Sequence, residues 1–294
     1  MDKIALLIIY NHRFDKNIPI LNKIYENRFS HIYHIVPFYD GEEKNVIPVY
    51  ESSYRFQGYV SQAYNMLRSK GFTHFFVVAD DMMINPSINE KNLWEVTSIP
   101  HEHCYIHSFN IFQTKKEHWE RTMEALDYDP DIKGVEIRNI IPTNKEAAER
   151  FRFHNIPTTP LPFGKLMRNI KKCRTFSLGK KMQILGRMGR FRYPVVGGYS
   201  DIFLVTADVM DKFTLYCGAF AATGLFVEVA IPTALALAAD KIVFDKDIKL
   251  KEKALWTGED YKFLDKYNFN LQKLVQDYPA DTLYIHPIKL SKWK

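Results

Sequence analysis

The feature that most constrains this chain is an apolar run, Phe75 to Ala79, that ends in two adjacent carboxylates, Asp80 and Asp81. Five consecutive apolar residues are typical of a strand buried on both faces of a parallel sheet. Because the interior of a buried strand does not tolerate two carboxylates, the chain has to reach the surface there. Ligands of open α/β sheets bind at the carboxyl ends of strands. A helix cap or an acidic turn would explain the pair equally well, so both interpretations stay open.

The residues before this pair alternate between strand and helix patterns. Repeated β-α-β units with short connections predict an α/β fold with a mostly parallel, doubly wound central sheet flanked by helices. A glycine-rich dinucleotide fingerprint is absent, which gives little support to NAD or FAD binding. The expected strands cover Ile4–Tyr10, His31–Pro37, Val46–Tyr50 and Phe75–Ala79, and the expected helices cover Ile18–Asn27 and Gly58–Ser69.

The pattern weakens between Pro86 and Pro194 and becomes regular again after Pro194. In the weak part we expect a strand over Cys104–Phe112, helices over Lys116–Ala125 and Asn144–Phe153, and a loop at Pro157–Pro162. In the last part we expect a strand over Ile202–Thr206, helices over Ala207–Phe213 and Gly224–Ala239, and a short strand over Leu283–Lys289. We therefore predict a single domain, 1–294, with an inserted basic region at 113–194.

Composition places the chain among ordinary folded proteins, with 46% apolar and 25% charged residues in 294. Its three cysteines are widely spaced, which is typical of reduced thiols in an intracellular protein. The first residues do not resemble a signal peptide, and the longest apolar stretch, 216–239, is interrupted by Glu228 and Pro232. We expect a cytoplasmic protein.

Positive charge is concentrated in one segment. Residues 165–192 contain ten lysines or arginines and no acid, although the net charge of the chain is only +6. Such a segment attracts phosphates or an anionic membrane, and a solvated charged face explains it equally well. It contains no recognised nucleic-acid-binding module, so nucleic acid is not expected as a partner. Contact through 165–192 would hold the protein peripherally at the inner face of the membrane.

Four further features carry candidate chemistry. The pair Asp80 and Asp81 forms a hard oxygen site suited to Mg²⁺ or Mn²⁺, and such a metal suits a diphosphate. Glu228 stands alone among apolar residues, and a desolvated carboxylate with a raised pKa suits a base that takes a proton from a hydroxyl. A structural acid paired with a buried arginine remains the alternative. A candidate substrate loop, or else a tight turn, contains Gly198, Tyr199, Ser200 and Asp201, and the tail presents His286 after a short strand.

Together these parts resemble a GT-A-fold glycosyltransferase. The resemblance covers a β/α half, a strand ending in acids, a later helix with one acid, and a C-terminal histidine. The Asp-x-Asp signature of the family is represented by Ala79-Asp80-Asp81, without its regular spacing. The resemblance implies that Asp81 and His286 hold Mn²⁺ or Mg²⁺, that Asp80 faces the sugar, and that Glu228 is the catalytic base of an inverting reaction.

The same resemblance assigns the nucleotide to the first half, 1–112, and the acceptor to 195–294. Candidate contacts for the base or the phosphates follow the first two strands or flank the helix after the third: Asn11, Arg13, Asp40, Arg55 and Gln62. For Arg13 and Arg55 an ordinary surface cation is the alternative.

The implied activity is transfer of a sugar from a nucleotide-diphosphate donor, a UDP-sugar foremost, to a glycan or lipid-linked glycan acceptor in cell-surface polysaccharide biosynthesis. The metal would stabilise the charge that grows on the leaving diphosphate. One alternative is a nucleotidyltransferase acting on sugar phosphates, although the turn after the first strand, Asn11-His12-Arg13, lacks the glycine such enzymes use. The other is a non-catalytic GT-A-like binding module.

Overall fold

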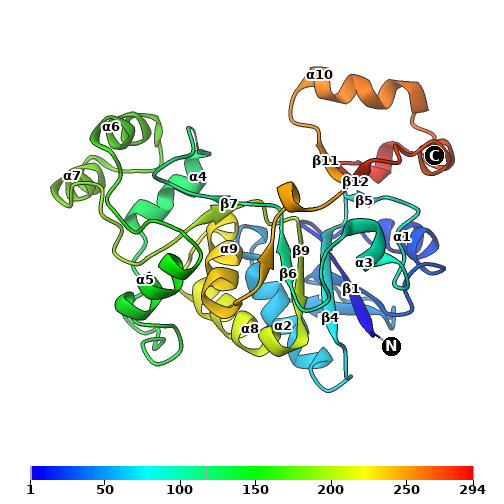
Figure 1. Cartoon of the computed structure of the whole chain (residues 1–294), viewed down its shortest axis with the longest axis horizontal. Helices are drawn as coiled ribbons and strands as arrows, with labels where there is room; N and C mark the ends of the chain where they lie inside the picture. The colour runs from blue at the N-terminus through cyan, green and yellow to red at the C-terminus, as the bar shows by residue number, and fades with distance from the viewer. Residues whose placement is uncertain (1, 117, 294) are drawn as a thin grey trace.

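A seven-stranded sheet forms the centre of the protein (Figure 1), as seen in a computed structural model that describes residues 2–116 and 118–293. The strand order is β10-β6-β9-β4-β1-β2-β3. Strand β9 lies antiparallel to both of its neighbours, and the pairs β1–β2, β1–β4, β2–β3 and β6–β10 are parallel. The predicted α/β fold with a mostly parallel central sheet is confirmed. The strands are β1 (Ile4–Ile9), β2 (Ile32–Pro37), β3 (Val46–Val49), β4 (His74–Ala79), β6 (Cys104–Ile106), β9 (Ile202–Thr206) and β10 (Ile242–Val243).

Helices cover both faces of this sheet, which explains why β1 and β4 are apolar throughout. Alternate residues of β1 belong to two different cores: Ala5, Leu7 and Ile9 pack with the helices of one face, and Ile4, Leu6 and Ile8 with those of the other. The first face carries α2 (Gln57–Leu67), α8 (Ala207–Ala222) and α9 (Val227–Ala238), and the second carries α1 (Asn17–Tyr25) and α3 (Leu93–Thr97).

A second, three-stranded sheet lies above the carboxyl ends of the main strands in the view of Figure 1. Its order is β11-β12-β5, so it joins the C-terminal tail to the segment that directly follows β4. The predicted tail strand exists but ends at His286, before Pro287. The elements of this region are β5 (Met83–Ile84), β11 (Lys251–Ala254), β12 (Thr282–His286), α10 (Gly258–Tyr261) and α11 (Leu271–Gln276).

The middle of the chain forms the left part of Figure 1. Helix α5 (Asn144–Phe153) is confirmed, and a Thr143–Glu146 capping box begins it. The predicted strand over Cys104–Phe112 is wrong in extent, because it breaks into β6 and the short β7 (Phe109–Asn110), which pairs with β8 (Gly197–Gly198). The basic segment contains α6 (Phe163–Lys172) and α7 (Leu178–Gly186).

The helix expected over Gly224–Ala239 begins only at Val227, as α9, and two other helices differ more from prediction. The helix expected over Lys116–Ala125 is a short α4 (Glu120–Met123) that continues as a 3-10 turn, and residue 117 lies outside the described part. Helix α8 extends nine residues beyond the expected Phe213, because its further turns still bury Cys217 and Phe220. The 3-10 turns are η1 (Ser53–Arg55), η2 (Glu124–Asp127), η3 (Asp245–Asp247), η4 (Lys262–Tyr267) and η5 (Leu290–Lys292).

The middle segment shares its core with the main sheet. Phe151, Leu166 and Ile184 belong to the same buried cluster as Val77 of β4 and Val229 of α9. None of the helices in the described residues is long and apolar enough to cross a membrane.

Candidate functional site

Strand register brings the acidic pair and the C-terminal histidine together. Strands β5 and β12 are antiparallel, with Ile285 opposite Met83, so the next residue of β12, His286, arrives beside Asp81. The Nε2 atom of His286 lies 3.0 Å from Oδ1 of Asp81. The backbone carbonyl of Asp81 also accepts a 2.6 Å hydrogen bond from the N–H of Ile288. Two residues 205 positions apart in the sequence therefore meet at the carboxyl end of β4.

A tyrosine holds the other ring nitrogen of His286. Nδ1 lies 2.7 Å from the hydroxyl of Tyr199, whose ring stacks on Tyr284 at 6.2 Å between centroids. Burial acts to lower the pKa of His286, but the hydrogen bond and charge of Asp81 outweigh it and leave that pKa raised. The imidazole is therefore fixed in position from both sides.

The two aspartates face different surroundings. Asp80 is buried, and its Oδ2 accepts a 3.0 Å hydrogen bond from the Nδ2 of Asn17. Burial, followed by the neighbouring charge of Asp81, raises the pKa of Asp80 to about 7, and a backbone hydrogen bond from Asn11 opposes this rise. The side chain of Asp81 is 28% exposed. Asp81 is thus the carboxylate that remains open to a ligand.

Two side chains at this site, Asp81 and His286, are of the type that could serve as ligands to a divalent metal in place of their mutual hydrogen bond. Within the described residues, no group of three His, Cys, Asp or Glu side chains is arranged to hold a metal ion. Asp81 and His286 supply one carboxylate and one imidazole, a set that Mn²⁺ accepts. Such cations commonly complete their coordination with phosphate oxygens and water, so the donor set fits a metal that arrives with a diphosphate.

Glu228 lies in the first turn of α9. The charge of Asp201 acts on Glu228 and also on His286. Oε2 of Glu228 accepts a 3.4 Å hydrogen bond from Oγ1 of Thr122. Burial and then the charge of Asp201 raise the pKa of Glu228 to about 7, while Lys115 opposes the rise. The described residues do not provide the structural arginine partner, because the charged groups acting on Glu228 are Asp201 and Lys115. A partly buried carboxylate with this pKa is suited to proton transfer near neutral pH.

The Gly198–Asp201 segment is built into the framework of the site. A Cβ on Gly198 would lie 2.8 Å from the carbonyl oxygen of Ser108 and 3.0 Å from Cβ of Pro232, so close packing explains this glycine. Ser200 donates to the carbonyl of Val227 at 3.3 Å and ties the segment to the start of α9. Burial raises the pKa of Asp201, whose charge acts on both Glu228 and His286.

The nucleotide candidates are distributed over two regions. Arg13 forms ion pairs with Asp40 at 2.6 Å and with Asp15 at 2.8 Å, at the ends of β1 and β2. The hydrogen bond from Arg13 lowers the pKa of Asp40.

Gln62 and Arg55 lie on the α2 side of the sheet instead. Oε1 of Gln62 accepts a 2.9 Å hydrogen bond from the backbone N–H of Tyr50, which closes the end of β3. Arg55 lies 3.8 Å from Glu51, and a Cβ added at Gly224, in the turn between α8 and α9, would lie 3.6 Å from the guanidinium of Arg55. Gln62 is still connected to the Arg13–Asp40 pair, because the ring of Tyr50 meets that of Phe38 at 5.9 Å and the carbonyl of Phe38 accepts a 3.3 Å hydrogen bond from Arg13.

Further residues lie near the Asp81–His286 pair, and sequence reasoning assigned no role to them. Nε2 of His107 lies 2.6 Å from Glu252, which also accepts a 3.0 Å hydrogen bond from the hydroxyl of Tyr284. Trp256 is 65% exposed and meets the ring of His286 at 5.9 Å. The sequence carries only weak signals for them: Glu252 is an acid between two lysines, and Trp256 is a tryptophan in a polar stretch.

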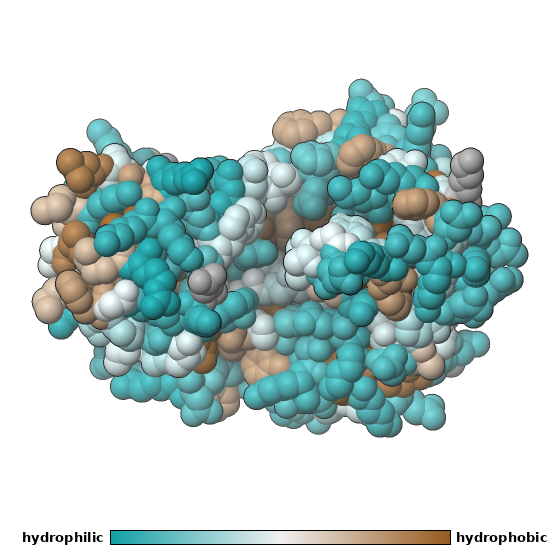
Figure 2. All heavy atoms as spheres, turned by 90° about the horizontal axis from the view of Figure 1, so that it is seen from above, coloured by the Kyte–Doolittle hydropathy of each residue, from teal (hydrophilic) through white to brown (hydrophobic). Residues whose placement is uncertain are grey.

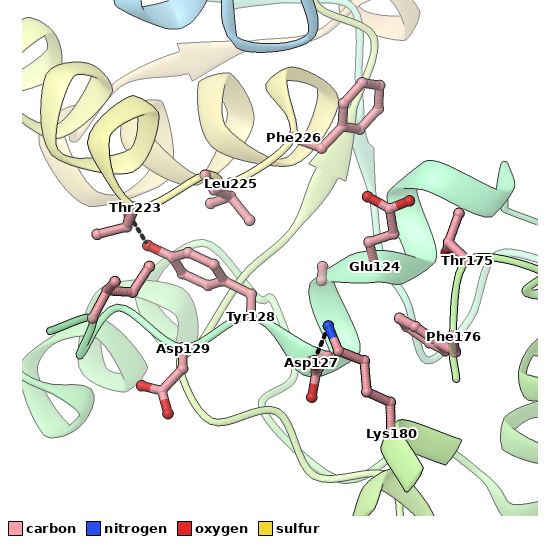
Figure 3. A pocket seen from close by; sticks show the side chains of 13 residues that line it. Glu124, Asp127, Tyr128, Asp129, Thr175, Phe176, Lys180, Thr223, Leu225 and Phe226 are labelled. Atoms are coloured by element: carbon pink, nitrogen blue, oxygen red, sulfur yellow. Dashed lines mark hydrogen bonds and ion pairs between the residues drawn. The ribbon is translucent and has the colours of Figure 1, made fainter. Parts of the chain in front are cut away.

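A pocket of about 460 Å³ opens beside the start of α9 (Figure 3). Its walls come from η2, α7 and the α8–α9 turn. The hydroxyl groups of Tyr128 and Thr223 are hydrogen-bonded at 2.7 Å, and Lys180 forms an ion pair with Asp127 at 3.0 Å. Phe226, two residues before Glu228 in the chain, is one of the residues that line this pocket, whereas Glu228 is not.

Comparisons with known protein families, with curated proteins and with solved structures found no match to this chain. The site itself therefore has to carry any conclusion about function.

Proposed function

We propose that this protein is a metal-dependent, inverting glycosyltransferase of the GT-A type that uses a nucleotide-diphosphate sugar. The observation that carries the proposal is the meeting of Asp81 and His286 at the carboxyl end of β4, with the desolvated Glu228 at the start of α9. These residues come from three distant parts of the chain. The C-terminal histidine returning over an acidic strand end is the arrangement that the family resemblance led us to expect.

Asp81 and His286 would hold Mn²⁺ or Mg²⁺, which when bound supplies charge stabilisation to the leaving diphosphate. Tyr199 keeps the ring of His286 oriented through Nδ1. Asp80, held by Asn17, borders the same position from the β1 side and is assigned to the donor sugar. The Arg13–Asp40 pair borders the ends of β1 and β2, where we assign the nucleotide.

Glu228 is the proposed general base. Its carboxylate takes the proton of an acceptor hydroxyl while the hydroxyl oxygen bonds to the anomeric carbon. The bond from that carbon to the diphosphate breaks in the same displacement, and the electron pair leaves with the nucleoside diphosphate. Direct displacement from the opposite face inverts the anomeric centre.

We propose a glycan or lipid-linked glycan as the acceptor, and the surface pocket beside the start of α9 offers a place for it. A UDP-sugar as donor and a role in cell-surface polysaccharide assembly are the corresponding proposals for the substrate and the process.

Thermal-shift measurements with UDP, GDP, CDP and CMP, each with and without Mn²⁺, test the proposal. We expect one nucleoside diphosphate to raise the melting temperature only when the metal is present. Asp81→Ala should abolish this rise, whereas the exposed control Asp265→Ala should preserve it. A metal-dependent rise that survives in Asp81→Ala would refute the metal site. Stabilisation by a nucleoside diphosphate without metal would refute the metal-dependent mechanism.

A further inference from the structure

Helices α6 and α7 expose large apolar side chains to an unusual degree. Leu178, Phe163 and Met188 are 78%, 74% and 73% exposed, the highest values among large apolar side chains of the described residues. Met182 adds another at 62%. All four belong to α6, α7 or the turn that follows α7, and we call this region the α6–α7 surface. Figure 2 shows brown and tan spheres gathered at the left end of the molecule, where Figure 1 places these helices.

The outward face of α7 is apolar. Leu178 and Met182 are four residues apart and therefore share one side of the helix. Ile184 is buried on the opposite side, and Lys180 turns towards Asp127 of the neighbouring η2. A soluble surface helix normally has the reverse arrangement, with polar side chains outward.

The segment that carries this apolar face also carries cations without an ion pair to the described residues. Several exposed or partly exposed side chains form no ion pair with any residue in the described part of the chain: Arg168, Lys171, Arg174, Lys181 and Arg190. The segment 165–192 supplies no acid that could neutralise them. Lys180, Arg187 and Arg192, in contrast, are paired with Asp127 and Asp129.

We propose that the α6–α7 surface docks the protein on an anionic lipid bilayer, with Leu178 and Met182 entering the headgroup region and the cations contacting lipid phosphates. Binding at a membrane interface has two contributions, electrostatic attraction to anionic lipids and burial of apolar side chains. The basic residues supply the first, and the exposed leucine and methionine supply the second. A solvated charged face would not need the apolar residues. Nucleic acid sites pair cations with several aromatic stacking side chains, and Phe163 is the one strongly exposed aromatic residue on the α6–α7 surface within the described residues.

This inference stands independently of the proposed reaction. Lys180, on the inward side of α7, is the residue of this helix that lines the pocket of Figure 3. The charge pattern and the exposed apolar face exist whatever the pocket binds.

Vesicle flotation with the full chain tests the proposal, using phosphatidylcholine vesicles with and without phosphatidylglycerol. We expect binding only to the anionic vesicles. Replacing Arg168, Lys171, Arg174 and Lys181 by glutamine should weaken binding by roughly fivefold per residue, several hundredfold in all. The matched control replaces four exposed lysines away from α6 and α7 with the same change in net charge: Lys23, Lys44, Lys91 and Lys249. The control should bind as the native protein does.

The apolar contribution needs its own pair of variants. Leu178→Gln with Met182→Gln should weaken binding by about tenfold or more, because the lost burial is worth at least one large apolar side chain. The control, Leu215→Gln with Met66→Gln, changes the same residue types at 49% and 56% exposed positions on α8 and α2. Melting temperatures of all variants should match the native value, because every changed side chain is exposed or, for Lys181, partly exposed.

Two results would overturn the inference. One is binding to anionic vesicles that the glutamine variants do not weaken more than their controls. The other is stronger binding of the native protein to duplex DNA or RNA than to the vesicles, with no effect of the Leu178 and Met182 changes, which would make the surface a general polyanion site.

Discussion

Replacing Glu228 by glutamine should make the protein more stable at alkaline pH while it removes the proposed base. In the folded protein burial and then Asp201 raise the pKa of Glu228 to about 7, against 4.5 for an ordinary glutamate. Above pH 7 the folded state holds a desolvated charge that the unfolded state keeps in water. At 1.36 kcal/mol for each pKa unit, the cost approaches about 3 kcal/mol.

Glu228 is partly exposed, and the new amide needs hydrogen-bond partners. We therefore expect the variant to gain about 1–2 kcal/mol in free energy of unfolding at alkaline pH, less than this upper limit. For a chain of this length, that gain corresponds to a rise of about 2–3 °C in melting temperature. The sign depends on pH in a defined way. Because the pKa of this carboxyl is higher in the folded state, its ionisation lowers the free energy of unfolding only above about pH 4.5. The loss grows as the pH rises to about 7 and is complete above that value.

The assay is thermal denaturation of native protein and Glu228→Gln at about pH 5 and about pH 8. The variant should gain stability at the higher pH and show little difference at the lower one. Glu42→Gln, an exposed control, should leave both values unchanged. A variant less stable than the native protein at about pH 8, or a gain that does not depend on pH, would refute the desolvated carboxylate.

Activity gives a second readout of the same group. If Glu228 is the general base, sugar transfer by the native protein should rise as pH increases through about 7, because only the ionised carboxylate accepts a proton. Glu228→Gln should lower the rate of transfer by about 10²–10⁴-fold and keep metal-dependent nucleotide binding. Undiminished transfer by the variant would exclude Glu228 as the base even if the stability prediction holds.

Two further substitutions test the framework of the site. Gly198→Ala should lower the free energy of unfolding by about 1–3 kcal/mol, because the new Cβ would lie 2.8 Å from the carbonyl oxygen of Ser108. The helical control Gly164→Ala, with nothing within 4 Å, should be neutral or raise it by up to about 1 kcal/mol in chemical denaturation. Tyr199→Phe removes the 2.7 Å contact with Nδ1 of His286 and should raise the Mn²⁺ concentration needed for the nucleotide-dependent thermal shift by about tenfold or more. An unchanged Mn²⁺ requirement would count against His286 as a metal ligand.

Local patterns predicted the long elements well and the short ones poorly. The strands β1 and β4 are recognisable because helices cover both of their faces, so nearly every residue is apolar. Strands β5 and β11 have no such pattern, since two to four residues at the edge of a small sheet carry too little periodicity. The antiparallel direction of β9 also leaves no trace in its own sequence, which resembles that of any buried strand.

For the candidate site, the sequence by itself determined that two carboxylates follow a buried strand, that Glu228 stands among apolar residues, and that a basic segment lacks acids. These are consequences of local solvation, because a charge beside a long apolar run has to lie at a boundary or be desolvated.

Only the tertiary structure decided which of these residues meet. The β5–β12 register joins His286 to Asp81, and the hydrogen bond from Asn17 turns Asp80 inward and leaves Asp81 open. Packing against Pro232 explains Gly198, and the way α7 lies on the core turns Leu178 outward. Such contacts join segments far apart in the chain, so their geometry depends on strand register and helix packing, which no local pattern encodes.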